Sequence, residues 1–444
     1  MQNDLTRGSV LARLTRFALP FLLSYFLQTL YGLAYLFIVG QYEDVAATTA
    51  VSIGSQVMHM LTVMIVGLAM GSTVLIAQAV GKQDHSAVRA RIGNTAILFA
   101  GLSLALTLLL ILLVRPIVAL MSTPEEAVEQ AVAYLRICFA GIPFITAYNI
   151  ISSIFRGLGD SNSPLAFIAV ACVCNIGLDY WLIGGMRLGA AGAAFSTTIS
   201  QAISVLFAVC IIRARRIVQL QKKDFHPNRS IMGGIFGIGA PVALQDGFIQ
   251  VSFILITVIA NRRGLTDAAA VGIVEKIIGF LFLLPSTLLC TVSALSAQNI
   301  GAGKFQRAKQ TMWYAIAIGV LYGTLAVLLM QFAALQAVGL FTTDAATAAA
   351  GSAYLHGYAF DVLLAGVHFC FSGYFCALGK SGLSFLHNAI SIVFVRVPGA
   401  YVMSHLFPQT LLPMGLSSSA GSLCSIVICI LCYILLSRSK RANL

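Results

Sequence analysis

The chain has 444 residues, of which 59% are apolar and only 9% are charged, and its mean hydropathy is +0.92. A water-exposed globule of this composition would be insoluble, so the lipid bilayer has to be the solvent. The net charge of +12 is explained by a basic inner face against anionic lipid, and it requires no nucleic-acid partner.

Apolar stretches of about 20 residues or more recur along the whole chain, and each can cross a hydrocarbon core of roughly 30 Å as a helix. They predict an all-α polytopic membrane protein with twelve transmembrane helices. The first stretch is too long for a signal peptide, so we expect it to remain as the first span. The predicted spans are residues 14–39, 50–79, 93–121, 131–154, 164–183, 189–212, 231–260, 267–297, 311–341, 351–376, 383–406 and 412–437.

Basic residues gather in alternate connecting segments, which orients the chain because Lys and Arg accumulate on the cytoplasmic side. Of the 27 basic residues, 20 precede the first span, follow even-numbered spans or close the chain. Loops of the other parity carry mostly acids, with Arg262 and Arg263 as the main exceptions. We therefore predict a multi-pass protein of the plasma (inner) membrane with both termini in the cytoplasm.

One half of the chain occurs twice. Residues 77–161 align without a gap to residues 297–381, and 16 of the 85 pairs are identical. The repeat predicts an N-lobe of helices 1–6 (1–212), a basic cytoplasmic linker (213–230) and a C-lobe of helices 7–12 (231–444). Since six-helix units enter and leave on one face, they are expected to be parallel repeats around a central site, which is typical of transporters.

Several other classes of protein are excluded or disfavoured. No Gly-rich loop ends in Gly-Lys-Ser/Thr, which excludes ATP-driven transport by this chain alone. Neither Asp-rich loops nor a Ser/His/Asp set is present, so an integral-membrane enzyme is disfavoured. The ten cysteines are scattered within the spans without the spacing of a disulfide framework or a zinc site, so no metal and no cofactor are expected.

Three sets of short motifs carry a family resemblance. They are Arg156-Gly-Leu-Gly-Asp-Ser-Asn-Ser-Pro164, the pair Ala77-Gln-Ala-Val-Gly-Lys82 and Ala297-Gln-Asn-Ile-Gly-Ala-Gly-Lys304, and Pro20 with Pro241 near the start of each lobe. In this order they resemble the multidrug and toxic compound extrusion (MATE) transporters over essentially the whole chain. The resemblance implies two six-helix bundles that export amphipathic, often cationic, organic compounds in exchange for H⁺ or Na⁺ by alternating access.

Other functions stay open beside that expectation. A flippase for lipids or lipid-linked substrates is disfavoured because only Lys276 and Arg396 are basic deep in the spans. A dedicated exporter of one metabolite is a further alternative, since the resemblance says little about native cargo. A passive channel is disfavoured by the two-lobe repeat. One chain contains both lobes, so we expect it to work as a monomer.

Asp179 is the main candidate for binding a coupling ion in the N-lobe. Asn175 lies four residues earlier, so the amide and the carboxylate share one helix face. Oxygen ligands on one face suit Na⁺, and a desolvated carboxylate can carry H⁺. The resemblance implies that both residues belong to a cation site with Thr197 or Thr198 as a third member. The alternative is that Asp179 lies near the outer end of its helix and is simply hydrated.

The first span departs from the family pattern at Tyr35. The segment from Leu27 to Gly40 resembles the family's first helix, in which an aspartate commonly stands at this position. A phenol cannot replace a carboxylate as a proton carrier near neutral pH. Coupling then rests on Asp179 alone, shifts to the C-lobe, or is weak. With Tyr35, the polar residues Gln28 and Gln56 are predicted to line the substrate cavity.

The C-lobe has more ionisable residues within its spans, each of which costs about 2.5–3.5 kcal/mol to insert. In one interpretation the acids bind protons or a cationic substrate, while the bases act as counter-charges. In the other, Glu275 with Arg396 and Asp246 with Lys276 form buried ion pairs that fix helix contacts. The family's C-lobe acid would fall near Gln250, so that correspondence fails here. The candidate residues are Asp246, Gln250, Glu275, Lys276, Asp361 and Arg396.

Overall fold

The computed structural model describes residues 4–215 and 219–442. Residues 216–218 of the predicted linker and the extreme termini (1–3 and 443–444) lie outside the described residues. Every regular element in the described ranges is a helix, which confirms the all-α prediction.

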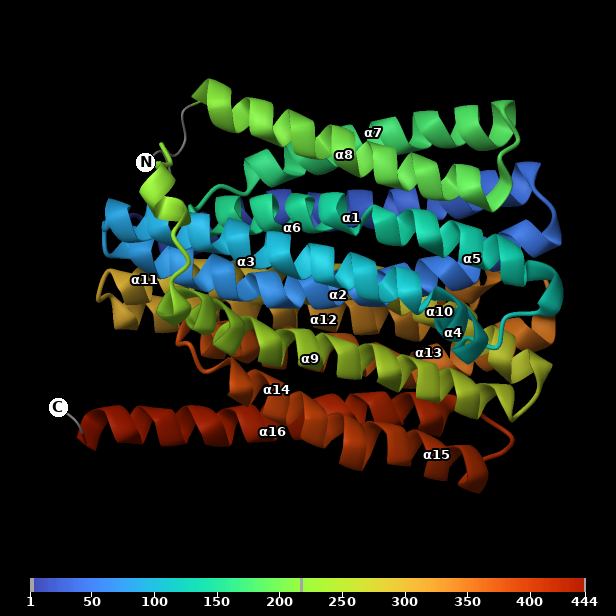
Figure 1. Ribbon diagram of the computed structural model, residues 1–444. Helices are drawn as coiled ribbons and strands as arrows, with labels where there is room; N and C mark the ends of the chain where they lie inside the picture. Colours follow the sequence, from blue (N-terminus) through green and yellow to red (C-terminus); the bar gives the residue numbers. More distant parts are fainter. Residues whose placement is uncertain (1–3, 216–218, 443–444) are drawn as a thin grey trace. The chain divides into compact units, whose positions relative to one another are not determined.

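The first half of the chain forms seven long or medium helices and one short one, with a π-helical turn near the end of the fifth predicted span. The elements are α1 (Val10–Tyr42), α2 (Val45–Gly81), α3 (His85–Leu112), α4 (Val114–Leu120), α5 (Glu125–Ala140), α6 (Ile142–Gly157), α7 (Asn162–Asp179), η1 (Tyr180–Gly185) and α8 (Gly189–Arg215). Helices α7 and α8 pack side by side (Figure 1).

The second half repeats this plan after the short 3₁₀ turn η2 (Lys222–Phe225). Helix α13 packs against α11, α12 and α16 within this half. The elements are α9 (Arg229–Asn261), α10 (Leu265–Leu281), α11 (Leu283–Gly301), α12 (Phe305–Gly339), α13 (Ala345–Ala377), α14 (Ser381–Ser391), η3 (Ile392–Arg396), α15 (Val397–Leu406) and α16 (Leu412–Ala442).

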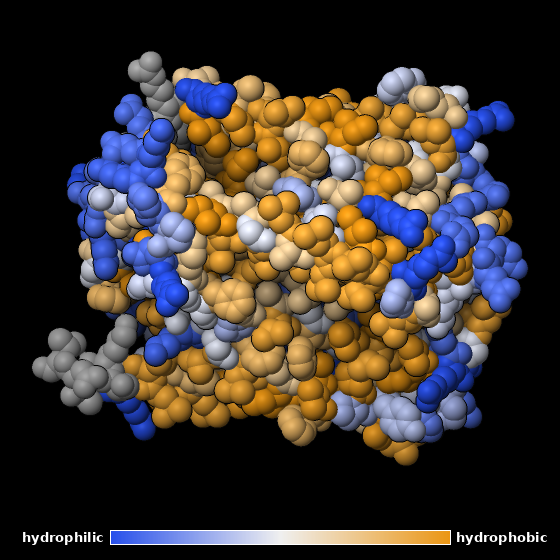
Figure 2. Space-filling view, in the orientation of Figure 1, coloured by the Kyte–Doolittle hydropathy of each residue, from blue (hydrophilic) through white to orange (hydrophobic). Residues whose placement is uncertain are grey.

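Eleven helices or helix runs of the described residues are long and apolar enough to cross a membrane. The pair α5 and α6, bent by 47° at Gly141, passes the same test as one broken span. Counted in this way, the described residues contain the predicted twelve spans. On the face shown in Figure 2, hydrophobic residues lie along the helices and hydrophilic residues gather at both ends, as a bilayer requires.

The internal repeat is visible in the lengths of the helices. Both α1 and α9 have 33 residues and contain a proline, Pro20 and Pro241. Helix α2 has 37 residues, and so does the run from α10 to α11. The two halves break at different places: the first half at Gly141, two residues before Pro143 in α6, and the second at Phe282, three residues before Pro285 in α11. A proline lacks the amide that continues a helix, which accounts for both breaks.

Internal contacts divide the chain into two compact units that exchange the starts of their first helices. One unit contains Leu19–Gly239, and the other contains Leu5–Ala18 together with the chain from Ala240 onward. The first turns of α1 therefore belong to the second unit, and the first turns of α9 belong to the first unit. Both crossings fall next to the prolines of these helices.

Basic side chains hold the N-terminal segment within the second unit. The ammonium group of Lys304 donates to the carbonyl oxygen of Thr6 at 2.9 Å. The guanidinium group of Arg307 donates to the carbonyl oxygens of Gly8 at 2.7 Å and Arg7 at 3.1 Å. These charge-assisted bonds satisfy carbonyl groups before the first turn of α1.

The first unit holds the segment before α9 in a similar way. Asn94 donates to the carbonyl oxygen of His226 at 3.2 Å and accepts from the amide of Asn228 at 2.7 Å. Arg89 lies 3.6 Å from the carboxylate of Asp224. In each unit, residues that follow the second span of that half thus fix the chain that leads into the first helix of the other half.

Candidate functional site

Asp179 is fully buried at the end of α7, where the helix passes into the π turn η1. The hydroxyl of Ser196 on α8 donates to its Oδ1 atom. Asn175 donates to the same hydroxyl at 3.4 Å. The amide and the carboxylate therefore share one helix face, as the spacing predicts, and Ser196 bridges them. The interpretation of Asp179 as a merely hydrated residue is wrong, because none of its surface is exposed.

Two oxygen atoms of this group have no protein partner among the described residues. They are Oδ2 of Asp179 and Oδ1 of Asn175, and both are buried. In the described ranges no basic side chain lies within ion-pair distance of Asp179. A buried carboxylate with one unbonded oxygen and no counter-charge is costly unless a proton or a cation compensates its charge, so this group has the chemistry of a candidate cation site.

The structure places Ser196, and neither neighbouring threonine, against the carboxylate. The hydroxyl of Thr197 donates to the carbonyl oxygen of Ala193 at 3.1 Å. Thr198 faces Gly141, where an added Cβ would lie 2.7 Å from its side chain. The sequence does carry a signal for Ser196, because small residues recur at every third or fourth position of α8 at Ala193, Ser196, Ser200 and Ser204. The structure shows that all four are buried.

Tyr35 lies near Asp179, but its hydroxyl bonds to another tyrosine. Its oxygen is 2.8 Å from that of Tyr134, and both side chains are buried. Tyr31 and Tyr35 are close enough to the carboxylate of Asp179 to interact with it electrostatically. The position at which the family resemblance leads one to expect an aspartate is here part of a hydrogen-bonded phenol pair, Tyr35 with Tyr134.

The other two predicted cavity residues are not part of the Asp179 group. Gln28 is half-buried on α1 and bonds to the side chain of Tyr148. Gln56 is exposed on α2. Their role in a substrate cavity stays a prediction.

In the second unit, Asp361 forms a buried ion pair with Arg396. The guanidinium Nη2 lies 3.0 Å from Oδ2 of Asp361 and donates to the hydroxyl of Tyr358 at 2.6 Å. The hydroxyl of Ser422 donates to Oδ1. The guanidinium carbon also lies 5.4 Å from the ring centre of Phe253 and 5.7 Å from that of Tyr358. Asp361 is thus neutralised by a cation that aromatic rings hold in place.

A row of buried polar groups continues from this ion pair. The hydroxyl of Ser422 lies 3.3 Å from Nε2 of His368, whose ring centre is 5.6 Å from that of His387. Nε2 of His387 lies 2.8 Å from the hydroxyl of Ser372. Sequence reasoning singled out Asp361 and Arg396 but missed Tyr358, Ser422 and His387, because nothing in a linear pattern shows which polar residues of α13, α14 and α16 meet.

The buried pairs considered from the sequence were assigned to the wrong partners. Glu275 is half-buried, accepts from the hydroxyl of Thr257 at 3.1 Å and interacts with Arg396 only at longer range. Lys276 is exposed and makes no ion pair in the part of the chain that the structure describes. The Asp246–Lys276 pair is therefore wrong, and the partner of Arg396 is Asp361 because the two meet between α13 and η3.

Asp246 and Gln250 are both half-buried on α9, one turn apart. The carboxylate of Asp246 has no hydrogen-bond or ion-pair partner among the described side chains. Like Asp179 and Glu275, it is an acid within a span that has no ion-pair partner among the described residues.

Comparison with known proteins agrees with the fold and with the repeat. The MatE family matches residues 20–181 and again residues 241–402. A Bacillus subtilis (strain 168) protein named "Probable multidrug resistance protein YoeA" is 28% identical over 408 residues, which cover 90% of this chain and 88% of that protein. "Multidrug export protein MepA" of Staphylococcus aureus (strain N315) is 25% identical over 435 residues, with 97% and 95% covered.

Among solved structures, a MATE transporter crystallised in complex with MaL6 superposes with a TM-score of 0.92 at 22% identity, covering 98% of both chains. The likeness of this structure shows the fold. The family match extends over most of both halves, and each half contains one copy of it. The chain therefore belongs to the MatE family of multi-pass membrane transporters and is not an enzyme.

Proposed function

We propose that this chain is a secondary active exporter of amphipathic organic compounds, mainly cations, and that an inward flow of H⁺ or Na⁺ through the Asp179 group drives export. The observation that carries the proposal is the fully buried carboxylate of Asp179, which has no basic partner among the described residues.

The chemistry of the Asp179 group fits a small cation. A lone carboxylate in a membrane span is unfavourable by several kcal/mol unless its charge is compensated. The open oxygens of Asp179 and Asn175, with the hydroxyl of Ser196, offer hard oxygen ligands for Na⁺. A proton on Oδ2 neutralises the same charge without further ligands. Either cation would be bound from one side of the membrane and released to the other in alternating access.

The rest of the proposal rests on the family and on the sequence. Relatives named for multidrug resistance and multidrug export support small organic cargo. The distribution of basic residues supports cytoplasmic termini in the plasma (inner) membrane. The presence of both halves in one chain supports a monomer as the working unit.

Reconstituted vesicles test the proposal directly. We would impose a H⁺ gradient or a Na⁺ gradient separately and follow a fluorescent organic cation for wild type, Asp179→Asn and Asp246→Asn. Loss of gradient-driven movement in Asp179→Asn alone is the expected result, and the gradient that drives the wild type identifies the coupling ion.

Asp246→Asn is the matched control, because it also removes an acid without a counter-charge from a span. Loss of coupling only in this variant would move the coupling site to the C-lobe. If folded wild-type protein moves the cation without regard to either gradient, the exchange mechanism is wrong for that cargo. A flippase for lipid-linked substrates would then become the leading candidate.

A further inference from the structure

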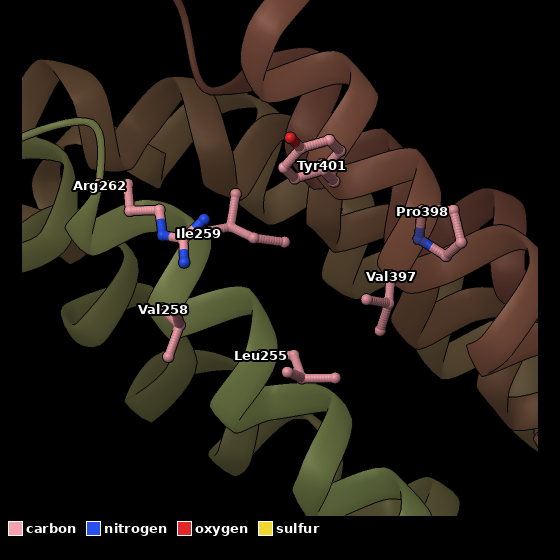
Figure 3. Close-up of a pocket in the computed structure, with 7 residues that line it drawn as sticks. All are labelled: Leu255, Val258, Ile259, Arg262, Val397, Pro398 and Tyr401. Atoms are coloured by element: carbon pink, nitrogen blue, oxygen red, sulfur yellow. The ribbon is translucent and has the colours of Figure 1, made fainter.

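A groove of about 340 Å³ opens between α9 and α15 within the second unit. This volume is at the lower end of the range for small-molecule sites, roughly 300–1,000 Å³. Figure 3 shows side chains of both helices along the groove. Its lining consists of Leu255, Val258 and Ile259 on α9, Arg262 directly after α9, and Val397, Pro398 and Tyr401 on α15.

The groove is apolar at one end and polar at the other. Leu255 lies well before the C-terminal end of α9, and Val397 well before the C-terminal end of the span Ser381–Leu406. Arg262 directly follows α9, and Tyr401 lies closer to the end of its span than Val397 and Pro398 do. Helix ends mark the membrane surface in a chain of this kind. The groove thus runs from a polar mouth at the interface to an apolar floor within the hydrocarbon layer.

Two neighbouring arginines at this mouth differ in their contacts. Arg263 is fully engaged: its Nε lies 2.6 Å from the carboxylate of Asp267, and its terminal nitrogens donate to the carbonyl oxygens of Ser404 and Pro408 at 2.6 and 2.9 Å. Arg262 is exposed, and its guanidinium has no hydrogen-bond or ion-pair partner in the described ranges. One arginine fixes the α15–α16 loop, and the other remains available to an anion.

We infer that this groove binds an anionic phospholipid, with the acyl chain along the α9–α15 floor and the phosphate on Arg262. The polarity of the groove matches that of a lipid, whose charged head lies at the interface and whose chain lies deeper. Its charge complements a phosphate, and Tyr401 provides an aromatic side chain at the depth where such residues favour the interface. No other groove residue is charged, so the anion belongs at the mouth alone.

The bound chain would lie against helices that hold the buried ion pair. Val397 directly follows Arg396, and Leu255 lies two residues after Phe253, whose ring packs against the Arg396 guanidinium. The inference is independent of whether Asp179 couples transport, because it concerns only the groove between α9 and α15 in the second unit.

Native mass spectrometry of protein equilibrated with equal amounts of phosphatidylglycerol and phosphatidylcholine tests this site. We expect wild type to retain phosphatidylglycerol preferentially and Arg262→Gln to lose about fivefold of that preference. Arg187→Gln is the matched control: Arg187 is an exposed arginine that also follows an odd-numbered span but lies outside the groove, so its preference should equal that of wild type.

Two further measurements distinguish binding of a whole lipid from binding of an anion alone. Val258→Trp fills the groove and should reduce retention of both lipids, and inorganic phosphate should displace neither. An unchanged preference in Arg262→Gln would overturn the inference. Displacement of phosphatidylglycerol by inorganic phosphate alone would also overturn it, since the mouth would then be a plain anion site without a role for the acyl chain.

Discussion

The two halves of this transporter differ in whether a basic side chain compensates the charge of a buried carboxylate. Asp179 and Asp361 are both fully buried within spans, and each accepts a serine hydroxyl. Asp361 has Arg396 at 3.0 Å, whereas Asp179 has no basic partner among the described residues. A carboxylate with a permanent counter-charge is already compensated and gains little from a mobile cation. The carboxylate without one is the better candidate for an ion that comes and goes.

The difference continues in the surroundings of each acid. Two phenols that bond to each other lie near Asp179, while the Arg396 guanidinium at Asp361 lies against two aromatic rings. Each half also has a π-helical turn next to its site: η1 begins directly after Asp179, and η3 ends at Arg396. Such turns are frequent at functional sites. The same fold thus contains two kinds of buried acid. We call Asp179, which has no counter-charge among the described residues, the open acid, and Asp361 with Arg396 the closed pair.

Removal of the cation from the closed pair should have the largest effect. Arg396→Gln leaves Asp361 buried without a counter-charge, which we expect to lower the free energy of unfolding by about 3–5 kcal/mol. Thermal unfolding in detergent measures this loss. Lys276→Gln, which removes an unpaired basic residue from a span, should change stability little. The apolar double variant Arg396→Leu with Asp361→Leu should recover most of the loss, and equal stability of Arg396→Gln and wild type would contradict the closed-pair description.

Packing beside the open acid gives the next effect. A Cβ at Gly54 would lie 2.3 Å from the ring of Tyr134, so Gly54→Ala should lower stability by about 1–3 kcal/mol through overpacking. The corresponding residue of the second half is Val274, which is buried there. Gly101→Ala is the control, because nothing lies within 4 Å of its Cβ position. If both variants unfold at the wild-type temperature, Tyr134 is not tightly held in the first half.

A smaller effect is expected from the phenol pair. Tyr35→Phe removes the 2.8 Å hydrogen bond to Tyr134 and should cost about 0.5–1.5 kcal/mol of stability. Gradient-driven transport should persist, since the phenol carries no proton in the proposed mechanism. Abolished transport in a stable Tyr35→Phe protein would show that the tyrosine takes part in coupling.

The smallest change in stability is expected at the open acid itself. Asp179→Asn removes a charge but breaks no ion pair and keeps an oxygen that accepts from Ser196, so stability should shift by less than about 1 kcal/mol. Asp361→Asn should destabilise several-fold more because it leaves Arg396 uncompensated. Equal losses of unfolding temperature in the two variants would erase the distinction between the open and closed acids.

The sequence predicted the spans well and the contacts between them poorly. Hydropathy located all twelve spans because burial in lipid requires long apolar runs. Hydropathy did not predict the break at Gly141 within the predicted span 131–154, where the helix axis bends by 47°. Pro143 indicates that the helix can bend there, but the sequence does not give the size of the bend.

The sequence could not predict which side chains contact Asp179 and Arg396, because these contacts join different helices. Ser196, Thr197 and Thr198 are adjacent, and only the rotation of α8 against α7 decides which one reaches Asp179. The choice of Asp361 over Glu275 as the partner of Arg396 depends in the same way on how α13 and η3 pack. The i, i+4 relation of Asn175 and Asp179 was predictable because it lies within one helix.

The exchange of helix starts imposes an order on biosynthesis. Thr6 leaves the ribosome early, but the Lys304 side chain that holds it is encoded 298 residues later. At about 5–20 residues per second, the N-terminal segment waits on the order of 15–60 s for its partner. The segment before α9, by contrast, emerges after Asn94 and can dock on a first unit that is already made. Insertion of the first half can thus finish early, while the start of its first helix stays unattached until α12 begins to appear.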